Sequence, residues 1–247
     1  MIPYFEFTSI QAGPLTLYVW GFFVALGFVA GSLAAGWMAR RRNLKIVAVY
    51  DLAAIAMLAG LVGGRLAHIL LYDPGYYLGN PSEILMIWHG GLSVYGGFIA
   101  VVIAGAIYLR RKKLSVWDYA DTAVFGLPVG LWIGRIGCFL IHDHPGTQTS
   151  FPLGIEFPDG IIRHDHGLYL SINGLAMAIT FLLLARKQRQ TGLYIAIFAL
   201  WYGIVRFGLD FLRAFDVRYL GLTPAQYLSI LLAAFGIITI YKLKNRK

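Results

Sequence analysis

Long apolar segments separated by short polar ones set the pattern of this chain. A helix that crosses the hydrocarbon core of a bilayer needs roughly 20 consecutive apolar residues. Seven segments approach that length, so the pattern predicts seven membrane-spanning helices. The expected spans are residues 15–39, 46–72, 91–109, 119–141, 168–185, 193–212 and 225–241.

Residues 73–90 form a polar connector after the second span. Helix breakers lie near each end of it, and the apolar run Ile84 to Trp88 lies between them. This pattern predicts one short helix at the outer leaflet.

Residues 142–167 are the longest polar insertion. Apolar positions alternate from Phe151 to Phe157, and the turn sequence PDG follows at residues 158–160, which predicts a small β-hairpin. The expected fold is all-α and integral to the membrane. It is a seven-transmembrane-helix bundle, residues 1–247, with a small periplasmic or extracellular head that contains the hairpin.

Composition agrees with a membrane protein. The 247 residues are 58% hydrophobic and 13% charged, which leaves too little polar surface to cover a soluble globule. The single cysteine, Cys138, excludes an intramolecular disulfide and a cysteine-only metal site. Met1 to Pro14 contains Glu6 and no basic residue, so we expect no cleavable signal peptide.

The net charge of +9 is concentrated in a way that indicates topology. Basic clusters that flank apolar spans mark the cytoplasmic face of a membrane protein, so we expect a membrane partner and no nucleic acid. The clusters place the N-terminus outside and the C-terminus in the cytoplasm. They are Arg40, Arg41, Arg42 and Lys45; Arg110, Arg111, Lys112 and Lys113; Arg186, Lys187 and Arg189; and Lys242, Lys244, Arg246 and Lys247.

Three arginines interrupt the apolar spans. Arg65, Arg135 and Arg206 each lie about two turns inside the outer end of a span, roughly 10 Å below the boundary. Ionisable groups at that depth are costly, and their default interpretation is functional. The alternative for Arg135 alone is an arginine that snorkels to the interface.

An anionic ligand would balance these charges. Arg206, Asp210 and Arg213 share one helical face, and Asp210 neutralises only part of the positive charge. A planar guanidinium group suits phosphate or carboxylate. The residues therefore predict a phospholipid-binding pocket that opens to the outer leaflet.

Glycines surround the expected pocket. Gly126, Gly130 and Gly134 recur every four residues before Arg135, which lets a neighbouring helix approach closely. The segment HGGLSVYGG at residues 89–97 predicts irregular backbone that lines a cavity, or alternatively a flexible surface turn. Trp20 belongs to an aromatic group at the outer end of the first span, which fits an interfacial belt or a lipid-binding wall.

Four histidines in the 142–167 insertion raise the alternative of a metal site. Metal ligands would not explain the buried arginines, and exposed histidines are commonly solvated. We therefore expect neither a metal nor another cofactor.

Four motifs in order along the chain resemble those of the prolipoprotein diacylglyceryl transferase family. Each motif is weak alone, but four of them on a seven-span frame are fairly specific. They are HGGLSVYGG at residues 89–97, GRIGCFL at 134–140, YGIVR at 202–206 followed by Asp210 and Arg213, and LTPAQYLS at 222–229.

The resemblance implies an enzyme that moves the diacylglyceryl group of phosphatidylglycerol to the lipobox cysteine of a preprolipoprotein signal peptide. Arg135 and Arg206 would hold the phosphate, Asp210 would orient Arg206, and Asp143 would orient Arg135 or bind the glycerol head. The other expected substrate-binding residues are Trp20, Arg65, Gly90, Gly91, Ser93, Gly96, Gly97, Gly134, Tyr202, Arg213 and Gln226.

The sequence departs from the family pattern at the residue that activates the thiol. Many members carry histidine where this chain has Tyr95, and a tyrosine is a poor base unless an adjacent arginine lowers its pKa. Tyr95, His142 and His164 remain candidates. The family's HPxQLYE run is only partly kept at residues 163–170, and Cys138 replaces a common asparagine as an inert buried thiol.

These departures leave a second hypothesis, a phospholipid-binding or scrambling protein without the chemistry. A solute transporter is disfavoured, because no inverted repeat is visible and the charges lie near one face. For the leading hypothesis we expect a monomer in the bacterial cytoplasmic membrane.

Overall fold

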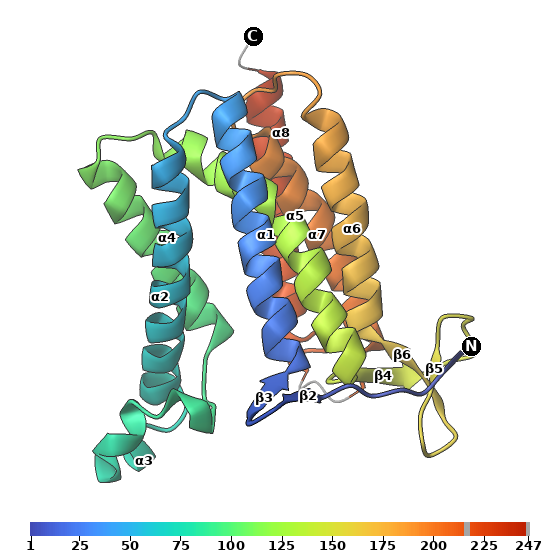
Figure 1. Cartoon of the computed structure of the whole chain (residues 1–247). Helices are drawn as coiled ribbons and strands as arrows, with labels where there is room; N and C mark the ends of the chain where they lie inside the picture. The colour runs from blue at the N-terminus through green and yellow to red at the C-terminus, as the bar shows by residue number, and fades with distance from the viewer. Residues whose placement is uncertain (215–217, 246–247) are drawn as a thin grey trace. The chain divides into compact units, whose positions relative to one another are not determined.

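Seven helices of the described residues are long and apolar enough to cross a membrane, as the sequence predicts. Their lengths match the spans to within a few residues, and Figure 1 shows their order. They are α1 (Val19–Arg41), α2 (Ile46–Leu71), α4 (Val94–Arg111), α5 (Val116–Ile141), α6 (His166–Leu184), α7 (Leu193–Leu209) and α8 (Pro224–Lys244).

The computed structural model describes residues 1–214 and 218–245, so Arg246 and Lys247 of the last basic cluster lie outside it. The chain divides into two compact units. Unit 1 comprises Met1–Met38 and Ala120–Lys247, and unit 2 comprises Ala39–Tyr119. Both boundaries fall inside helices, because α1 and α5 contribute residues to each unit.

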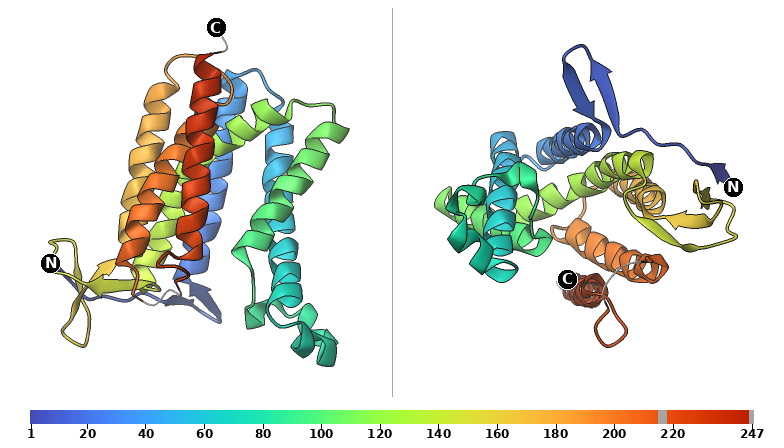
Figure 2. Two further views of the ribbon diagram at one scale, coloured as in Figure 1. Left: turned by 180° about the vertical axis from the view of Figure 1, so that it is seen from behind. Right: turned by 90° about the horizontal axis from the view of Figure 1, so that it is seen from below.

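Glycines let the helices of unit 1 pack at backbone distance. A Cβ atom on Gly126 of α5 would lie 2.1 Å from the carbonyl oxygen of Gly31 on α1, and one on Gly27 would lie 2.7 Å from that of Gly130. The predicted glycine stripe of α5 is therefore the surface that α1 covers. Helices α7 and α8 approach each other in the same way at Gly203, and they run side by side in both views of Figure 2.

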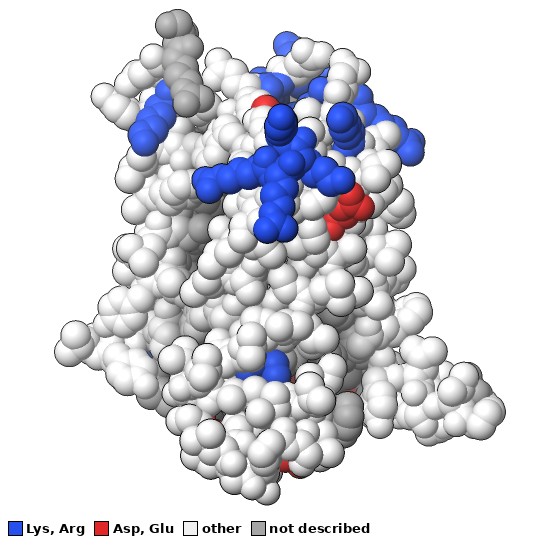
Figure 3. Space-filling model, turned by 90° about the vertical axis from the view of Figure 1, so that its left-hand side faces the viewer, with Lys and Arg blue, Asp and Glu red and all other residues white. Residues whose placement is uncertain are grey.

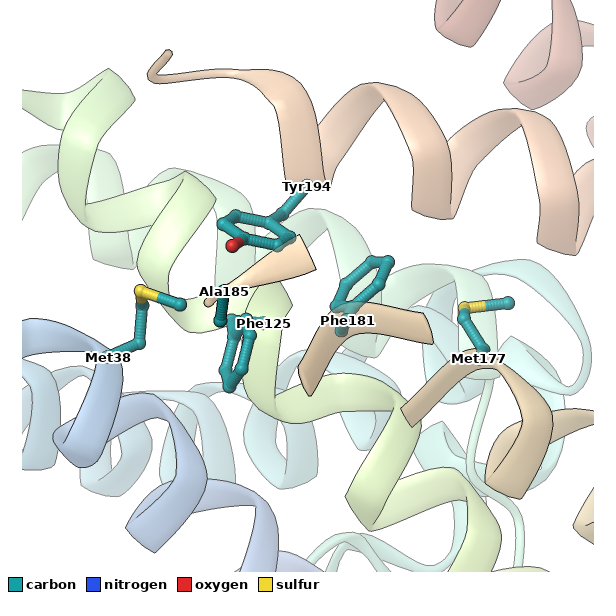
Figure 4. Packing of buried hydrophobic residues seen from close by; sticks show 6 residues of the cluster. All are labelled: Met38, Phe125, Met177, Phe181, Ala185 and Tyr194. Atoms are coloured by element: carbon teal, nitrogen blue, oxygen red, sulfur yellow. The ribbon is translucent and has the colours of Figure 1, made fainter. Parts of the chain in front are cut away.

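The apolar core of unit 1 lies between α1, α5, α6 and α7. Figure 4 shows the rings of Phe125, Phe181 and Tyr194 packed together, with Met38 and Met177 on either side. The ring centroids of Phe125 and Tyr194 are 5.0 Å apart and meet edge to face, an arrangement that aromatic pairs favour. This core fixes the helices on which the charged residues of unit 1 stand.

Short strands cover one end of unit 1. The predicted hairpin is present: β5 (Ile155–Glu156) and β6 (Ile162–Asp165) are antiparallel and joined by a tight turn. The sequence analysis missed two further strands of this sheet, β1 (Ile2–Pro3) parallel to β5 and β4 (Pro145–Gln148) antiparallel to β6.

A second hairpin lies just before α1. Strand β2 (Ser9–Ala12) pairs with β3 (Leu15–Tyr18) around Gly13, whose φ is +63°. Residues 15–18, which were expected to begin the first span, are therefore strand, and the helix starts at Val19. Hydropathy alone could not separate the two, because three of the four strand residues are apolar as well.

Unit 2 is a helical hairpin with a folded connector. Helices α2 and α4 pack closely, since a Cβ atom on Gly63 or Gly96 would lie within 3 Å of the facing helix. The predicted single helix at Ile84 to Trp88 is wrong. The connector instead contains α3 (Pro74–Gly79) and two short 3-10 helices, η1 (Pro81–Ile84) and η2 (Ile87–His89), which are separated at Leu85 and Met86.

Basic residues gather at the end of unit 2 away from this connector. Helix α4 ends in Arg110 and Arg111, and the chain enters α2 from Lys45. Figure 3 shows most of the visible Lys and Arg side chains toward one end of the face, while the remaining surface is mainly neither basic nor acidic. The Tyr108 hydroxyl donates to Asp51 and so joins the two helices near this end.

Candidate functional site

Arg206 and Asp210 form an ion pair where α7 ends. The Arg206 Nη2 and Asp210 Oδ1 atoms are 2.9 Å apart, and Asp210 is fully buried in the 3-10 turn η3 (Asp210–Leu212). Arg213 lies 3.9 Å from the same carboxylate oxygen. The three residues meet here, but they do not share one helical face as predicted, because α7 ends at Leu209, Asp210 lies in η3 and Arg213 is extended. Two cations share one anion at this point.

Thr223 holds the other side of the Asp210 carboxylate. Its hydroxyl donates to Asp210 Oδ2 and also accepts the backbone N–H of Gln226, 3.1 Å away, as the N-cap of α8. A capping box of this kind is stable because both partners satisfy helix-end N–H groups. The sequence analysis missed Thr223, although the spacing of threonine and glutamine in LTPAQ is the signature of such a box.

Gln226 is fully buried inside this arrangement. Its Oε1 accepts from the Thr223 N–H at 2.9 Å, and its Nε2 donates to the Phe207 carbonyl at 3.1 Å. The amide therefore ties the start of α8 to the end of α7. The structure places Gln226 behind the ion pair as a positioning residue, in contrast to the expected contact with substrate.

Arg135 lies on α5 beside a second acidic residue. Its Nη1 is 3.7 Å from the Cys138 sulfur, and both Asp143 and Trp20 lie within hydrogen-bonding reach of that thiol. Trp20 packs against the α5 backbone at Gly137, where a Cβ atom would come within 3.3 Å of it. The structure thus brings Arg135, Asp143 and Trp20 together around Cys138.

Asp143 is ionised at neutral pH. Burial alone would raise the pKa of the Asp143 carboxyl. His144 at 2.7 Å, the Cys138 thiol and the Arg135 charge together lower this pKa by more than burial raises it, so the pKa lies below its usual value. A carboxylate near Arg135 is what the expected orienting role requires.

The histidines of the head have separate partners. His164 Nδ1 lies 2.8 Å from the Tyr169 hydroxyl, and burial lowers the pKa of His164, so its imidazole is neutral near pH 7. His142 Nδ1 lies 2.7 Å from Asp165 Oδ2, and both side chains are buried. Among residues 1–214 and 218–245, no three metal-ligating side chains converge.

His142 is enclosed by aromatic rings. The rings of Tyr4, Phe5, Phe139 and Phe157 all lie with centroids within 5.7 Å of its imidazole. Asp165 also accepts the Leu168 N–H as the N-cap of α6. The His142–Asp165 pair therefore joins the sheet, α5 and α6, in a place closed to solvent.

Arg65 belongs to unit 2, and its partners are backbone atoms. The guanidinium has five N–H groups, and they donate to the carbonyls of Glu83, Ile84, Met86, Gly90 and Gly91. Arg65 is 5% exposed and stands over the Tyr77 ring. All five N–H donors of Arg65 are engaged, so this side chain holds the connector against α2. We had expected Arg65 to bind phosphate instead.

The glycine-rich segment 89–97 fits closely around α2. Gly90 and Gly91 have positive φ, and a Cβ on Gly91 would lie 2.8 Å from Arg65 Nη1. Ser93 caps α4, since its hydroxyl accepts the Gly96 N–H at 3.3 Å. Gly97 and Gly96 meet the α2 backbone, so these glycines serve helix packing where we expected contact with lipid.

Three further expected site residues lie on helices, Tyr95 in unit 2 and Tyr202 and Gly134 in unit 1. Tyr95 is 40% exposed in the first turn of α4. Tyr202 stacks on Phe198 one turn before Arg206, with ring planes 4° apart. Gly134 precedes Arg135 and faces Gly27 of α1, whose Cβ would lie 3.0 Å from its nitrogen.

Comparison with known proteins finds extensive similarity. Residues 8–242 match the family model described as prolipoprotein diacylglyceryl transferase. A phosphatidylglycerol–prolipoprotein diacylglyceryl transferase of Nitratidesulfovibrio vulgaris is 35% identical, with 95% of this chain and 93% of the relative aligned. Proteins of the same name from a Wolbachia of Drosophila simulans and from Nitrosomonas europaea are each 34% identical over at least 90% of both chains.

Proposed function

Because this chain belongs to the prolipoprotein diacylglyceryl transferase family, we propose that it moves the diacylglyceryl group of phosphatidylglycerol to the lipobox cysteine of a preprolipoprotein. The cysteine sulfur attacks the carbon of the diacylglyceryl group that is bonded to the phosphate oxygen. A C–S bond forms, the C–O bond breaks, and glycerol-1-phosphate leaves with the electron pair. No cofactor is needed, since the oxidation states of carbon and sulfur do not change.

The observation that carries this proposal is the cluster of Arg206, Asp210 and Arg213, in which two partly exposed guanidinium groups lie beside one buried carboxylate. A guanidinium group presents paired donors in one plane, a geometry that suits a phosphate group. An anionic lipid head group is therefore the ligand that this cluster suits best. Arg135 supplies the further donor that the family motif implies.

Electrostatic stabilisation of the leaving group is the main task of these residues. As the C–O bond breaks, negative charge grows on the phosphate, and fixed guanidinium groups stabilise it more than they stabilise the substrate. Asp210 keeps Arg206 in place, and Thr223 and Gln226 keep Asp210 in place. This support means that little reorganisation is required during the reaction.

The thiol must lose its proton to react, because a free cysteine is mostly protonated at neutral pH. Of the three candidates, His164 is best supported as the proton acceptor. Its imidazole is partly exposed and neutral near pH 7, whereas His142 is closed off by aromatic rings. Tyr95 stays as the alternative for the position where relatives carry histidine.

The proposed orientation places this cluster toward the outer leaflet of the bacterial cytoplasmic membrane. In unit 1 the strands lie at one end of the helices and the start of the α6–α7 connector lies at the other (Figure 1). The connector carries Arg186, Lys187 and Arg189, and cytoplasmic loops are rich in such residues. The N-terminus would then be outside, and the working form would be a monomer.

Mass spectrometry tests the transfer directly. Purified protein would be incubated with phosphatidylglycerol and a synthetic lipobox peptide, with the same peptide carrying serine at the cysteine position as control. We expect the mass of one diacylglyceryl group on the cysteine peptide and none on the serine peptide. An unmodified cysteine peptide, together with movement of labelled phosphatidylglycerol between leaflets, would favour the scrambling function instead.

A further inference from the structure

The buried pair of His142 and Asp165 has no assigned role in the transfer reaction. The His142 Nδ1 and Asp165 Oδ2 atoms are 2.7 Å apart, and each side chain is 1% exposed. Among the residues that the structure describes, the Nε2 atom of His142 has no hydrogen-bond partner, so Asp165 provides the polar contact of this ring. Breaking a buried pair of this kind is costly. The contact is therefore a firm link between two segments that lie 23 residues apart in the sequence.

Each partner of the pair is also fixed within its own segment. His142 directly follows α5, and its φ of +47° lies in the left-handed region, which residues other than glycine seldom adopt. Four aromatic rings enclose its imidazole. Asp165 ends β6 and caps α6, because its Oδ1 accepts the Leu168 N–H at 2.8 Å. The pair thus joins the end of α5 to the start of α6 through side chains that have little freedom to move.

The segment from His142 to Pro145 is attached to Asp165 at both ends. At one end the His142 side chain binds the Asp165 carboxylate, and at the other end Pro145 of β4 lies opposite Asp165 in the sheet. Asp143 lies between these two attachments, and its carboxylate feels the charge of Arg135. The place of Asp143 beside Arg135 therefore depends on Asp165.

His164 lies next to Asp165 in β6. Adjacent residues of a strand point to opposite faces. Asp165 points toward His142, and His164 points toward Tyr169, whose hydroxyl is 2.8 Å from His164 Nδ1. Asp165 is thus bonded in sequence to the proposed proton acceptor and in contact with the segment that carries Asp143.

We propose that the His142–Asp165 pair is a positioning device for the transfer reaction, which holds Asp143 beside Arg135 and fixes His164 relative to both. The inference rests on the proposed function, because it takes Asp143 as the residue that orients Arg135 and His164 as the proton acceptor. Both side chains of the pair are closed to solvent, so they act through these neighbours and do not contact substrate. Loss of the link would let the two segments shift, and a displacement of about 1 Å in a catalytic group lowers a rate by about 100-fold.

Two substitutions of Asp165 separate the link from the helix cap. Serine and asparagine both cap helices, but the short serine side chain cannot reach His142, whereas asparagine offers an N–H to its Nδ1 atom. We expect Asp165→Ser to lower kcat by about 10- to 100-fold. The KM for phosphatidylglycerol should stay within about threefold, because the Arg206–Asp210 pair is untouched. Asp165→Asn should keep kcat within about fivefold of the unsubstituted protein.

Ser171→Ala is the matched control for a loss of stability. The buried Ser171 hydroxyl donates to the Trp132 carbonyl at 3.0 Å and so also joins α6 to α5. Its removal should lower the melting temperature and leave kcat unchanged. If the His142–Asp165 pair served stability alone, Asp165→Ser would behave in the same way. That result, or an asparagine variant as impaired as the serine variant, would overturn the proposal.

Substitution of His142 covers the case in which Asp165→Ser does not fold. Asparagine and glycine both suit the left-handed backbone at this position, but only asparagine keeps a donor near the place of Nδ1. We expect His142→Gly to lower kcat as much as Asp165→Ser does, and His142→Asn to keep it within about fivefold. In the double variant of His142→Gly and Asp165→Ser, kcat should fall no further than in either single variant. Losses that multiply would contradict a pair that acts as one unit.

Amide exchange distinguishes a failure of this inference from a failure of the proposed function. In Asp165→Ser the amides of residues 143–146 should exchange with deuterium at least about tenfold faster than in Ser171→Ala, because one attachment of the segment is lost. Unchanged exchange would overturn the inference. Transfer by Asp165→Ser at the full rate would refute the positioning role while the enzyme function stands. No transfer by the unsubstituted protein would refute the proposed reaction, and faster exchange in Asp165→Ser would then still support the attachment of Asp143 to Asp165.

Discussion

Single residues in this protein are defined by what each side chain contacts. Arg206 and Arg65 are both arginines of apolar helices, but Arg206 meets a carboxylate and Arg65 meets five backbone carbonyls. The sequence alone predicts that both are important, because ionisable groups at membrane depth are costly. It cannot predict which of them has a donor left for a ligand, since the carbonyls around Arg65 come from a connector whose path is irregular.

The pH profile tests the role of His164. Burial lowers the pKa of His164 below its usual value of 6.5, and the neutral imidazole is the form that accepts a proton. Activity should therefore be retained as pH falls to 6.5 and be lost only below it, with an acid limb in kcat/KM. Asp143, whose pKa lies below the usual value for aspartate, stays ionised over this range and does not contribute.

His164→Asn provides the matching variant. It should lower kcat by about 100-fold, the smaller end of what a general base contributes, and abolish the acid limb. An acid limb that persists unchanged in this variant would point to another base, with Tyr95 the next to substitute.

At the scale of elements, the ends of three helices hold the cluster of Arg206, Asp210 and Arg213 in place. The ends of α7 and α8 meet through Asp210, Thr223 and Gln226, and the start of α6 is capped by Asp165. The sequence predicted the spans well because hydropathy reports burial in lipid. It did not predict strands β1 to β4 because they are only two to four residues long, and because β1 and β4 pair with segments farther along the chain.

Loss of the Thr223 hydroxyl should loosen this junction. Thr223→Val removes an N-cap and a hydrogen bond to a buried carboxylate, and we expect a loss of about 2 kcal/mol or more in the free energy of unfolding. Thr223→Ser, which keeps the hydroxyl, should lose about 1 kcal/mol for the buried methyl group. Denaturation followed by tryptophan fluorescence measures both, and equal losses would show that the hydroxyl is unimportant.

Arg65→Lys should free the connector of unit 2. A lysine has three donors in place of five and no planar geometry, so the amides of residues 83–91 should exchange with deuterium at least about tenfold faster, the effect of losing about 1.4 kcal/mol of local stability. Arg163→Lys, at an exposed ion pair with Asp159, serves as control. Unchanged exchange combined with weaker binding of phosphatidylglycerol would instead make Arg65 a lipid ligand.

At the scale of the whole molecule, the distribution of charge gives a topology that can be measured. With the strands outside, a maleimide that cannot cross membranes should label Gln148→Cys, an exposed position of β4, in intact cells. Gln188→Cys, an exposed position in the basic connector after α6, should be labelled only after the cells are opened. Labelling of both or of the second alone in intact cells would contradict the proposed orientation.

The central claim is that arginines from α5 and α7 bind one phosphate, and a double-mutant cycle tests it most directly. Arg135→Lys and Arg206→Lys should each lower kcat/KM for thioether formation by about 100-fold, since a lysine keeps the charge but lacks the paired donors. If both arginines act on one phosphate, the fold-loss in kcat/KM of the double variant should be clearly smaller than the product of the fold-losses of the two single variants. Full activity in either single variant, or a double loss of about 10⁴-fold that equals the product, would contradict a shared phosphate site.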